Sequence, residues 1–144
     1  MPAPRINVAM VFVSAVVVFL IGFIWYSLLF QRQWIQAHGF TQDQLDTMKT
    51  TVAKVYGISF VCILVMGVVL SELIHRTGAS GARAGAELGA LVWLGFAATI
   101  GLMASLYTGA PFLVYLLDCG YQLVYLLAMG AILGWARARR GLVS

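Results

Sequence analysis

Charged residues are scarce in this sequence. Lys, Arg, Asp and Glu make up 10% of its 144 residues, whereas 62% of the residues are hydrophobic. A soluble domain carries about 25% charged residues, so the composition excludes an ordinary soluble globular protein. The Lys and Arg residues are scattered near the ends of apolar runs rather than clustered with aromatic residues. We therefore expect no nucleic-acid partner.

Cysteine is also rare, and recognisable catalytic signatures are missing. Cys62 and Cys119 both fall inside apolar runs, no Cys-x-x-Cys pair occurs, and no His stands at the spacing of metal ligands. Small packing residues are the simplest interpretation of the two cysteines. The sequence has no His-Glu-x-x-His motif and no phosphate-binding glycine loop. We therefore expect no metal and no cofactor, and an enzyme is not the favoured class.

Four long apolar runs dominate the sequence instead, at residues 6–30, 55–74, 84–107 and 111–135. Each can cross a bilayer, which takes about 20 mostly apolar residues. The first run exceeds the roughly 7–15 residues of the apolar part of a signal peptide, so we expect it to remain as a span. The predicted fold class is all-α: a polytopic membrane protein, with an antiparallel four-helix bundle, formed by residues 1–144 as one membrane domain.

The segment between the first two runs, residues 31–54, is polar but contains no Pro and a single Gly. Gly39 predicts the end of one helix, and Thr41 with Gln44 forms the capping box of the next. Helices over residues 6–38 and 42–76 would each be about 50 Å long at ~1.5 Å per residue. The hydrocarbon core is only about 30 Å thick, so residues 31–54 are predicted to form a helical hairpin that protrudes from the membrane.

The distribution of Lys and Arg predicts the orientation of the chain. With four spans, both termini and the turn between spans two and three share one side of the membrane. That side holds Arg5, Arg76, Arg83, Arg137, Arg139 and Arg140, against Arg32, Lys49 and Lys54 on the other. Positive residues favour the cytoplasmic side. We therefore predict cytoplasmic termini in a plasma (inner) membrane.

Asp118 is an acidic residue well inside an apolar run. A charge at the middle of a membrane helix costs about 2.5–3.5 kcal/mol, which makes the residue a candidate functional site. At helical spacing Tyr121, Gln122 and Tyr125 fall on the same stripe as Asp118. We expect these three side chains to orient an ion, a proton or a small molecule at Asp118, or to tie the fourth span to its neighbours.

Aromatic and basic residues at the outer boundary extend this candidate site. Trp25 and Tyr26 close the first span, where such rings mark either the headgroup level or part of the site. Arg32 and Lys54 are possible ion-pair partners, because their long side chains can reach inward to neutralise Asp118. The alternative is a protonated Asp118 that is held by hydrogen bonds.

Two carboxylates lie at the predicted cytoplasmic boundary. Glu72 precedes Arg76 by four residues, and Arg83 precedes Glu87 by four. This spacing favours ion pairs within each helix. The alternative is that Glu72 and Glu87 line a polar cavity that opens to the cytoplasm.

Glycines recur on the third and fourth spans. They stand at Gly81, Gly85 and Gly89, and at Gly120, Gly130 and Gly134. Small residues let membrane helices approach closely. We therefore expect tight packing against another span or against a second copy of the chain, as a homodimer or higher homo-oligomer. The fourth span, with one polar and one glycine face, should be the most buried.

Several segments together resemble a known family. They are Gly22–Ser27, Trp93–Phe96, Asp118–Tyr121 and Met129–Trp135, and they are similar to the membrane family called domain of unknown function 1761. That family commonly has His after the Tyr, whereas this chain has Gln122, which cannot titrate. The resemblance implies a four-helix integral membrane protein and brings no established activity.

Three functions are compatible with these features. The first is binding or transport of a small molecule or ion, of unknown identity, at Asp118. The second is a structural or assembly role, in which the polar stripe and glycine faces serve packing. The third is a membrane-embedded enzyme that acts on lipid, which is suggested only by polar groups at lipid depth. In each case membrane lipid is an expected partner.

Overall fold

The computed structural model describes residues 6–143, and the regular elements among them are all helices. In chain order they are α1 (Val8–Phe23), η1 (Ile24–Leu29), α2 (Gln31–His38), α3 (Gln42–Thr77), α4 (Ala82–Val92), η2 (Trp93–Ala98), α5 (Thr99–Thr108) and α6 (Phe112–Val143). The prediction of an all-α protein is confirmed. Arg5, which was counted for the orientation, lies outside the described residues.

Four helical stretches of the described chain are long and apolar enough to cross a membrane. They are Val8–Leu29, Gln42–Thr77, Ala82–Thr108 and Phe112–Leu142. Each overlaps one of the predicted apolar runs, and the fourth continues beyond Trp135, where the predicted run ended. The chain therefore has the helices of a membrane protein.

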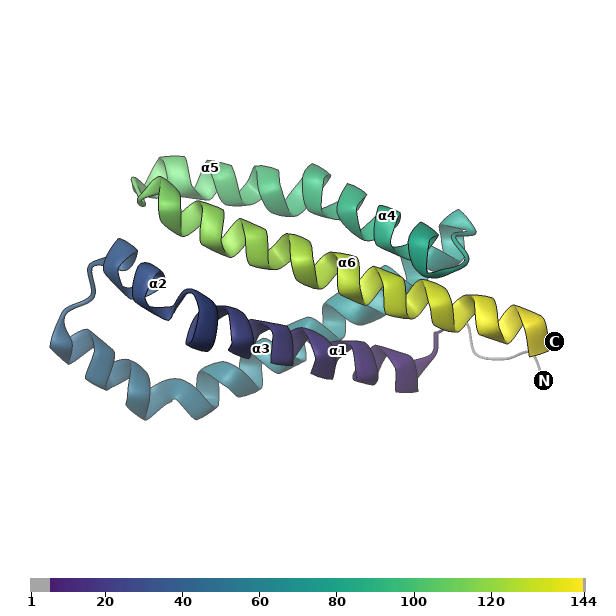
Figure 1. Cartoon of the computed structure of the whole chain (residues 1–144), viewed down its shortest axis with the longest axis horizontal. Coiled ribbons are helices and arrows are strands. Elements are labelled where there is room, and N and C mark those ends of the chain that lie inside the picture. The colour runs from purple at the N-terminus through teal and green to yellow at the C-terminus, as the bar shows by residue number, and fades with distance from the viewer. Residues whose placement is uncertain (1–5, 144) are drawn as a thin grey trace.

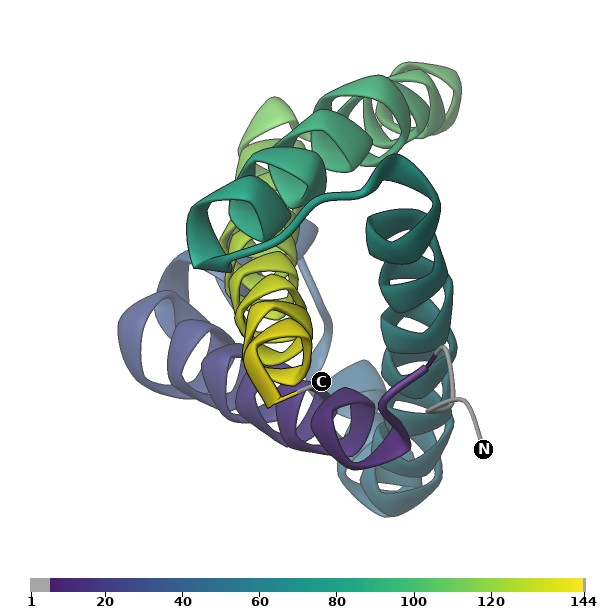
Figure 2. The same ribbon diagram turned by 90° about the vertical axis from the view of Figure 1, so that its right-hand side faces the viewer.

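Figure 1 shows that successive long helices reverse direction. The path through α1 and α2 runs from right to left, α3 returns, α4, η2 and α5 run left again, and α6 returns to the C-terminal end. The start of α1, the turn between α3 and α4 and the end of α6 therefore lie at one end of the molecule. In the end-on view of Figure 2, α6 lies between α1 and α4, and α3 stands to one side.

Caps fix where the helices begin and end, largely as the sequence predicts. Gly39 ends α2 with a left-handed backbone (φ 65°). Thr41 and Gln44 then form the predicted capping box at the start of α3, which continues without interruption to Thr77. The predicted long second helix is thus confirmed to within one residue at its end.

The first long helix is not regular along its length, so the prediction of one helix over residues 6–38 is wrong in detail. Residues Ile24–Leu29 form the π-helix η1, in which the Phe30 N–H donates to the Trp25 carbonyl at 2.9 Å. Phe30 then breaks the helix before α2 with φ −124° and ψ 14°. A second π-helix, η2 at Trp93–Ala98, interrupts the third candidate span. Such π-turns are rare and occur frequently at functional sites.

The core of the molecule is built around α6. This helix contacts α1, α2, α3, α4 and α5. The apolar window of the fourth candidate span is 39% buried, against 22%, 22% and 11% for the other three. The prediction that the fourth span is the most buried is therefore confirmed.

Glycines allow α4 and α6 to pack at close range. A Cβ added at Gly85 would overlap the carbonyl group of Gly130, and one added at Gly89 would overlap that of Leu126. The Gly81 N–H also donates to the Gly134 carbonyl at 3.0 Å. The tight packing predicted for these glycines is thus made between two spans of the same chain.

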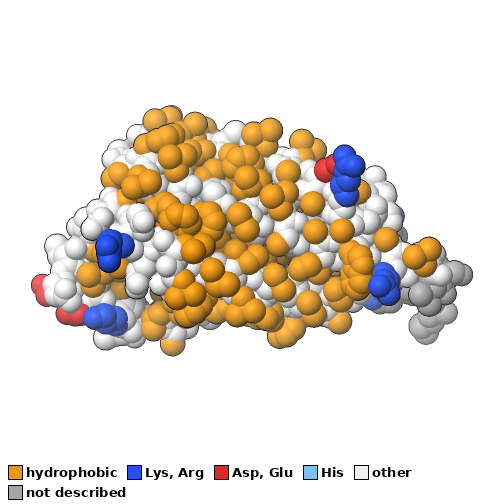
Figure 3. All heavy atoms as spheres, viewed as in Figure 1, with side chains coloured by type: hydrophobic (Ala, Val, Ile, Leu, Met, Phe, Trp, Pro, Cys, Tyr) orange, Lys and Arg blue, Asp and Glu red, His pale blue; other side chains and the backbone are white. Residues whose placement is uncertain are grey.

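The surface separates apolar and charged residues along the molecule. In Figure 3, hydrophobic side chains cover the middle of the visible face, while Lys, Arg, Asp and Glu gather toward its two ends. Many large side chains around the helices are exposed, including Val65 (57%) on α3 and Phe96 (65%) on η2. An apolar middle between two polar ends suits helices that are surrounded by lipid.

Candidate functional site around Asp118

Asp118 lies on the second turn of α6 and is bound by a phenol from the first candidate span. The Tyr26 Oη donates a hydrogen bond of 2.6 Å to the Asp118 Oδ1. Both residues are half-buried. One oxygen of the Asp118 side chain is therefore held by Tyr26, and the other has no described hydrogen bond.

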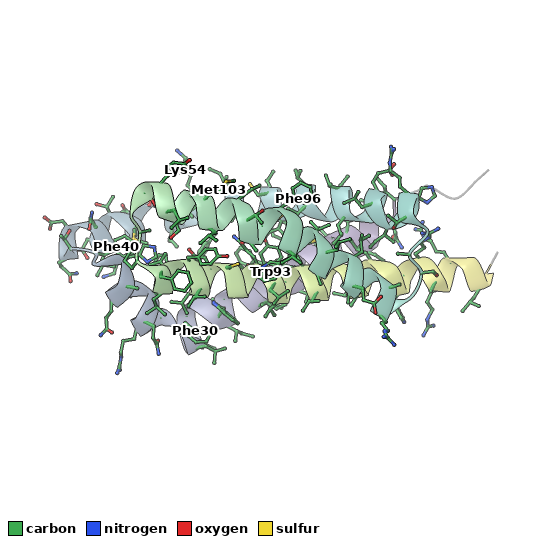
Figure 4. The ribbon with its side chains drawn as sticks, turned by 90° about the horizontal axis from the view of Figure 1, so that it is seen from above. Phe30, Phe40, Lys54, Trp93, Phe96 and Met103 are labelled. Atoms are coloured by element: carbon green, nitrogen blue, oxygen red, sulfur yellow. The ribbon has the colours of Figure 1, made fainter. Side chains whose placement is uncertain are left out.

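Two tryptophans hold the turn of α6 that carries Asp118. The Trp25 Nε1 donates to the Leu117 carbonyl at 3.1 Å, and the Trp93 Nε1 donates to the Cys119 carbonyl at 2.9 Å. Both acceptors are main-chain atoms next to Asp118 in the sequence. A buried indole N–H needs an acceptor, and these carbonyls provide one on each side of Asp118. Trp93 lies where the third span passes over α6 (Figure 4).

Both of these tryptophans come from the π-helices. Trp25 lies in η1 together with Tyr26, and Trp93 opens η2. The two irregular segments therefore meet α6 at the same turn. Two consecutive side chains of η1, Trp25 and Tyr26, bind adjacent residues of α6, Leu117 and Asp118.

Aromatic rings continue from this contact in both directions. Tyr26 packs edge-on against Tyr121 at 5.1 Å and against Trp34 of α2 at 5.8 Å, measured between ring centroids. Tyr121 packs against Tyr125 at 4.9 Å. Trp34 in turn contacts His38 at 4.2 Å. The predicted stripe on α6 and the aromatic pair of the first span are thus one continuous cluster.

The other predicted members of the site have no described hydrogen bond or ion pair with the carboxylate. Gln122 is half-buried, and none of the hydrogen bonds described for residues 6–143 joins its side chain to Asp118. Arg32 and Lys54 are exposed, and no ion pair in the described chain joins either of them to Asp118. Figure 4 shows Lys54 pointing away from the helices.

Helix α3 leaves α6 at about the depth of Asp118. The Tyr125 Oη donates to the Met66 Sδ at 3.5 Å, which brings the two helices together. Both helices run in the same direction in Figure 1, and Asp118 precedes Tyr125 by about 10 Å along the axis. The same step along α3 leads from Met66 to Ser59. From there toward the hairpin, every residue from Ile58 back to Asp46 is exposed, so this part of α3 does not cover Asp118.

Glu72 and Glu87, the two carboxylates predicted at the cytoplasmic boundary, lie near the end of α3 and the start of α4. Glu72 accepts from the Arg76 Nε at 2.9 Å, and Glu87 accepts from the Arg83 Nε at 2.9 Å. Both predicted intrahelical ion pairs are therefore present. Sequence reasoning missed Arg137, which donates to the carbonyls of Ile74 and Ala79 and closes the turn between α3 and α4. Its acceptors are main-chain atoms, which leave no signal in the sequence.

The glycines of α6 divide between two neighbours. Gly130 and Gly134 face α4, whereas a Cβ added at Gly120 would lie 3.3 Å from the Trp25 Cζ2. Gly120 thus makes room for the indole that binds next to Asp118. Among the described residues no group of three or more His, Cys, Asp or Glu side chains is placed to hold a metal ion.

Comparison with known proteins gives one result. A family model described as "Protein of unknown function (DUF1761)" matches residues 9–134. The resemblance inferred from the sequence is therefore confirmed. No curated protein and no solved structure matches the chain significantly.

Proposed function

The chain belongs to the DUF1761 family, which is described as one of unknown function, and we propose that it is a membrane protein that binds a positively charged ion or small molecule at Asp118. One observation carries the proposal. Asp118 lies inside the fourth candidate span, accepts one hydrogen bond from Tyr26, and has no Lys, Arg or His partner within residues 6–143.

The Asp118 carboxylate is costly inside a membrane span. An acidic group at the middle of a membrane helix costs about 2.5–3.5 kcal/mol on insertion. One phenolic hydrogen bond offsets only part of that cost, since a bond to a charged acceptor between membrane helices contributes about 1–2 kcal/mol. A cation that pairs with Asp118 removes the remaining charge. Proton, metal ion and organic cation are all candidates at this stage.

The proposal includes an arrangement in the membrane. The four candidate spans form an antiparallel bundle in the plasma membrane, residues 31–54 project on the outer side, and both termini are cytoplasmic. Transport, as distinct from binding, needs a second copy, because four helices leave little room for a water-filled path. Gly85, Gly89, Gly130 and Gly134 already face atoms of their own chain, so a homo-oligomer would form through another surface.

A structural role is the second candidate, and the two tryptophan contacts favour it. Trp25 and Trp93 bind carbonyls on both sides of Asp118, which is what a protein would use to fix α6 between its neighbours. In that case Asp118 serves mainly to accept the Tyr26 hydrogen bond. Replacing it would then lower stability and leave any response to cations unchanged.

Thermal unfolding in detergent separates the two functions. Wild type and Asp118→Asn are compared over a range of pH and in the presence of Na⁺, K⁺ or tetraphenylphosphonium. Asp46→Asn, which changes an exposed carboxylate on the hairpin, is the matched control. We expect at least one cation to raise the melting temperature of wild type and of Asp46→Asn but not of Asp118→Asn. Equal responses of all three proteins would exclude a cation site at Asp118.

A further inference from the structure

We propose that the cation taken at Asp118 is a hydrophobic organic cation, such as an ammonium ion with apolar substituents. This inference rests on the proposed cation site and names the class of its ligand. The geometry that points to it is a single carboxylate set among aromatic rings, at the depth where α3 leaves the bundle.

Oxygen atoms are too few around Asp118 for an inorganic cation. Ca²⁺ takes about 6–8 oxygen ligands and Mg²⁺ needs about six, and selective K⁺ sites replace the hydration shell with rings of carbonyls. Here the adjacent carbonyls of Leu117 and Cys119 each accept an indole N–H. The Tyr26 hydroxyl points its hydrogen at the carboxylate. An inorganic ion would thus keep most of its water inside an apolar span.

Aromatic rings are abundant at the same place. Tyr26 contacts the carboxylate through its hydroxyl and packs against both Trp34 and Tyr121. Tyr26 thus joins the carboxylate to the rings of Trp34 and Tyr121, so a cation that pairs with Asp118 is within reach of this cluster. Ring faces attract cations by about 0.5–1 kcal/mol at exposed sites and ~2 kcal/mol where water is excluded. Organic ammonium ions are the class that aromatic residues with a carboxylate recognise.

The path to the site selects for an apolar ligand. At the depth of Asp118, α3 turns away from α6, and its residues from Asp46 to Ile58 are exposed. Large apolar side chains of this stretch are exposed, among them Val52 (39% exposed), Val55 (52%) and Tyr56 (48%). This stretch carries two lysines: Lys49 pairs with Asp46 at 3.3 Å, and Lys54 points away from the helices (Figure 4). A ligand with an apolar body therefore reaches Asp118 from the lipid without crossing a positive group.

The test measures binding of tetraphenylphosphonium to the protein in lipid nanodiscs. Tetraphenylborate has the same shape and the opposite charge, so it reports binding by hydrophobicity alone. We expect wild type and Asp46→Asn to bind tetraphenylphosphonium with equal Kd and to bind tetraphenylborate no more than empty nanodiscs do. Asp118→Asn should raise the Kd for tetraphenylphosphonium at least tenfold. Trp34→Leu should raise it about 2- to 30-fold, the equivalent of one cation–π contact.

The Trp34→Leu variant keeps the test decisive if Asp118→Asn does not fold, because Trp34 lies on the short helix α2 and leaves the carboxylate in place. Tetraphenylphosphonium binding that both variants leave unchanged would overturn the inference. The inference would also be overturned if only H⁺, Na⁺ or K⁺ shifted the melting temperature in a way that depends on Asp118. The proposed cation site would then stand, and only the organic class of its ligand would be wrong. If no cation acts through Asp118, both proposals fail.

Discussion

At the scale of single residues, several aromatic side chains of the apolar spans find main-chain acceptors inside the chain. The indoles of Trp25 and Trp93 and the phenol of Tyr115 bind main-chain carbonyls, the last of them that of Ala98 at 3.0 Å. Asp118 differs, because it is an acceptor with one oxygen in use. An unpaired polar oxygen in an apolar environment costs free energy. A ligand that pairs with Asp118 would remove that cost.

The bond between Tyr26 and Asp118 can be measured by a double-mutant cycle. Tyr26→Phe removes the hydroxyl and keeps the ring, and we expect it to lower the free energy of unfolding by about 1–2 kcal/mol, since the acceptor is charged. In the Asp118→Asn background the same change should cost less, because a neutral amide is a weaker acceptor. The coupling energy should be about 1 kcal/mol. Unfolding in mixed micelles gives all four values.

Two outcomes of this cycle are informative. A coupling energy indistinguishable from zero would mean that the 2.6 Å contact does not stabilise the fold. A melting temperature of Asp118→Asn equal to or above that of wild type would support a functional carboxylate, since a residue kept for function often lowers stability. A clear loss of stability would favour the structural role.

Trp93 offers a second measurement at this scale. Trp93→Phe removes the N–H that binds the Cys119 carbonyl and should lower the free energy of unfolding by about 1 kcal/mol. The matched control is Trp135→Phe, because Trp135 is 45% exposed and its ring contacts only the Arg139 guanidinium among the described cation–π pairs. The same micelle unfolding assay compares them. Equal losses for the two variants would show that the carbonyl contact is not responsible.

At the scale of helices, the sequence predicts where a helix ends better than which type of helix forms within an apolar run. Gly39, Thr41 and Gln44 have local roles that depend on their immediate neighbours, so the end of α2 and the start of α3 could be placed in advance. The π-helices could not, because an apolar run such as Ile24–Leu29 has the same composition in either helical form. Their cause is tertiary: Trp25 and Trp93 bind carbonyls of another helix.

The glycine contact between α4 and α6 is testable at the same scale. A methyl group at Gly85 or Gly130 would meet the main chain of the other helix, which cannot give way as a flexible side chain does. We expect Gly85→Ala and Gly130→Ala each to lower the free energy of unfolding by about 1–3 kcal/mol, the usual cost of overpacking. Melting temperatures in detergent provide the comparison.

Gly57 on α3 is the control for those substitutions. No atom lies within 4 Å of a Cβ added there, and Ala is favoured over Gly in a helix by about 1 kcal/mol. Gly57→Ala should therefore be neutral or stabilising. Equal destabilisation by all three variants would mean that the loss at Gly85 and Gly130 does not come from the contact between α4 and α6.

At the scale of the whole molecule, the candidate site was only partly predictable. Asp118, Tyr121 and Tyr125 share a stripe that helical spacing predicts, and the aromatic cluster joins them to Trp25 and Tyr26. Trp34 and Trp93 were not assigned to the site, because helical spacing reports which residues share one helix and not which helices meet. Whether Lys54 reaches Asp118 depends on the path of α3, and whether Arg32 does depends on the path of α2; composition encodes neither path.

Orientation in the membrane is the last prediction, and it depends on the whole chain. The described chain places Arg76, Arg83 and the end of α6 at one end of the molecule and the α2–α3 hairpin at the other. Since Lys and Arg favour the cytoplasmic side, the hairpin should face outward.

A Thr47→Cys variant, in a background without Cys62 and Cys119, should react with a membrane-impermeant maleimide in intact bacterial cells. Ser80→Cys, in the turn between α3 and α4, should react only after the membrane is disrupted, and the cysteine-free chain measures background. The reverse pattern would invert the orientation and place Asp118 toward the inner leaflet. If Thr47→Cys reacts only in detergent, the hairpin lies within the membrane, and an organic cation would have to reach Asp118 along its surface.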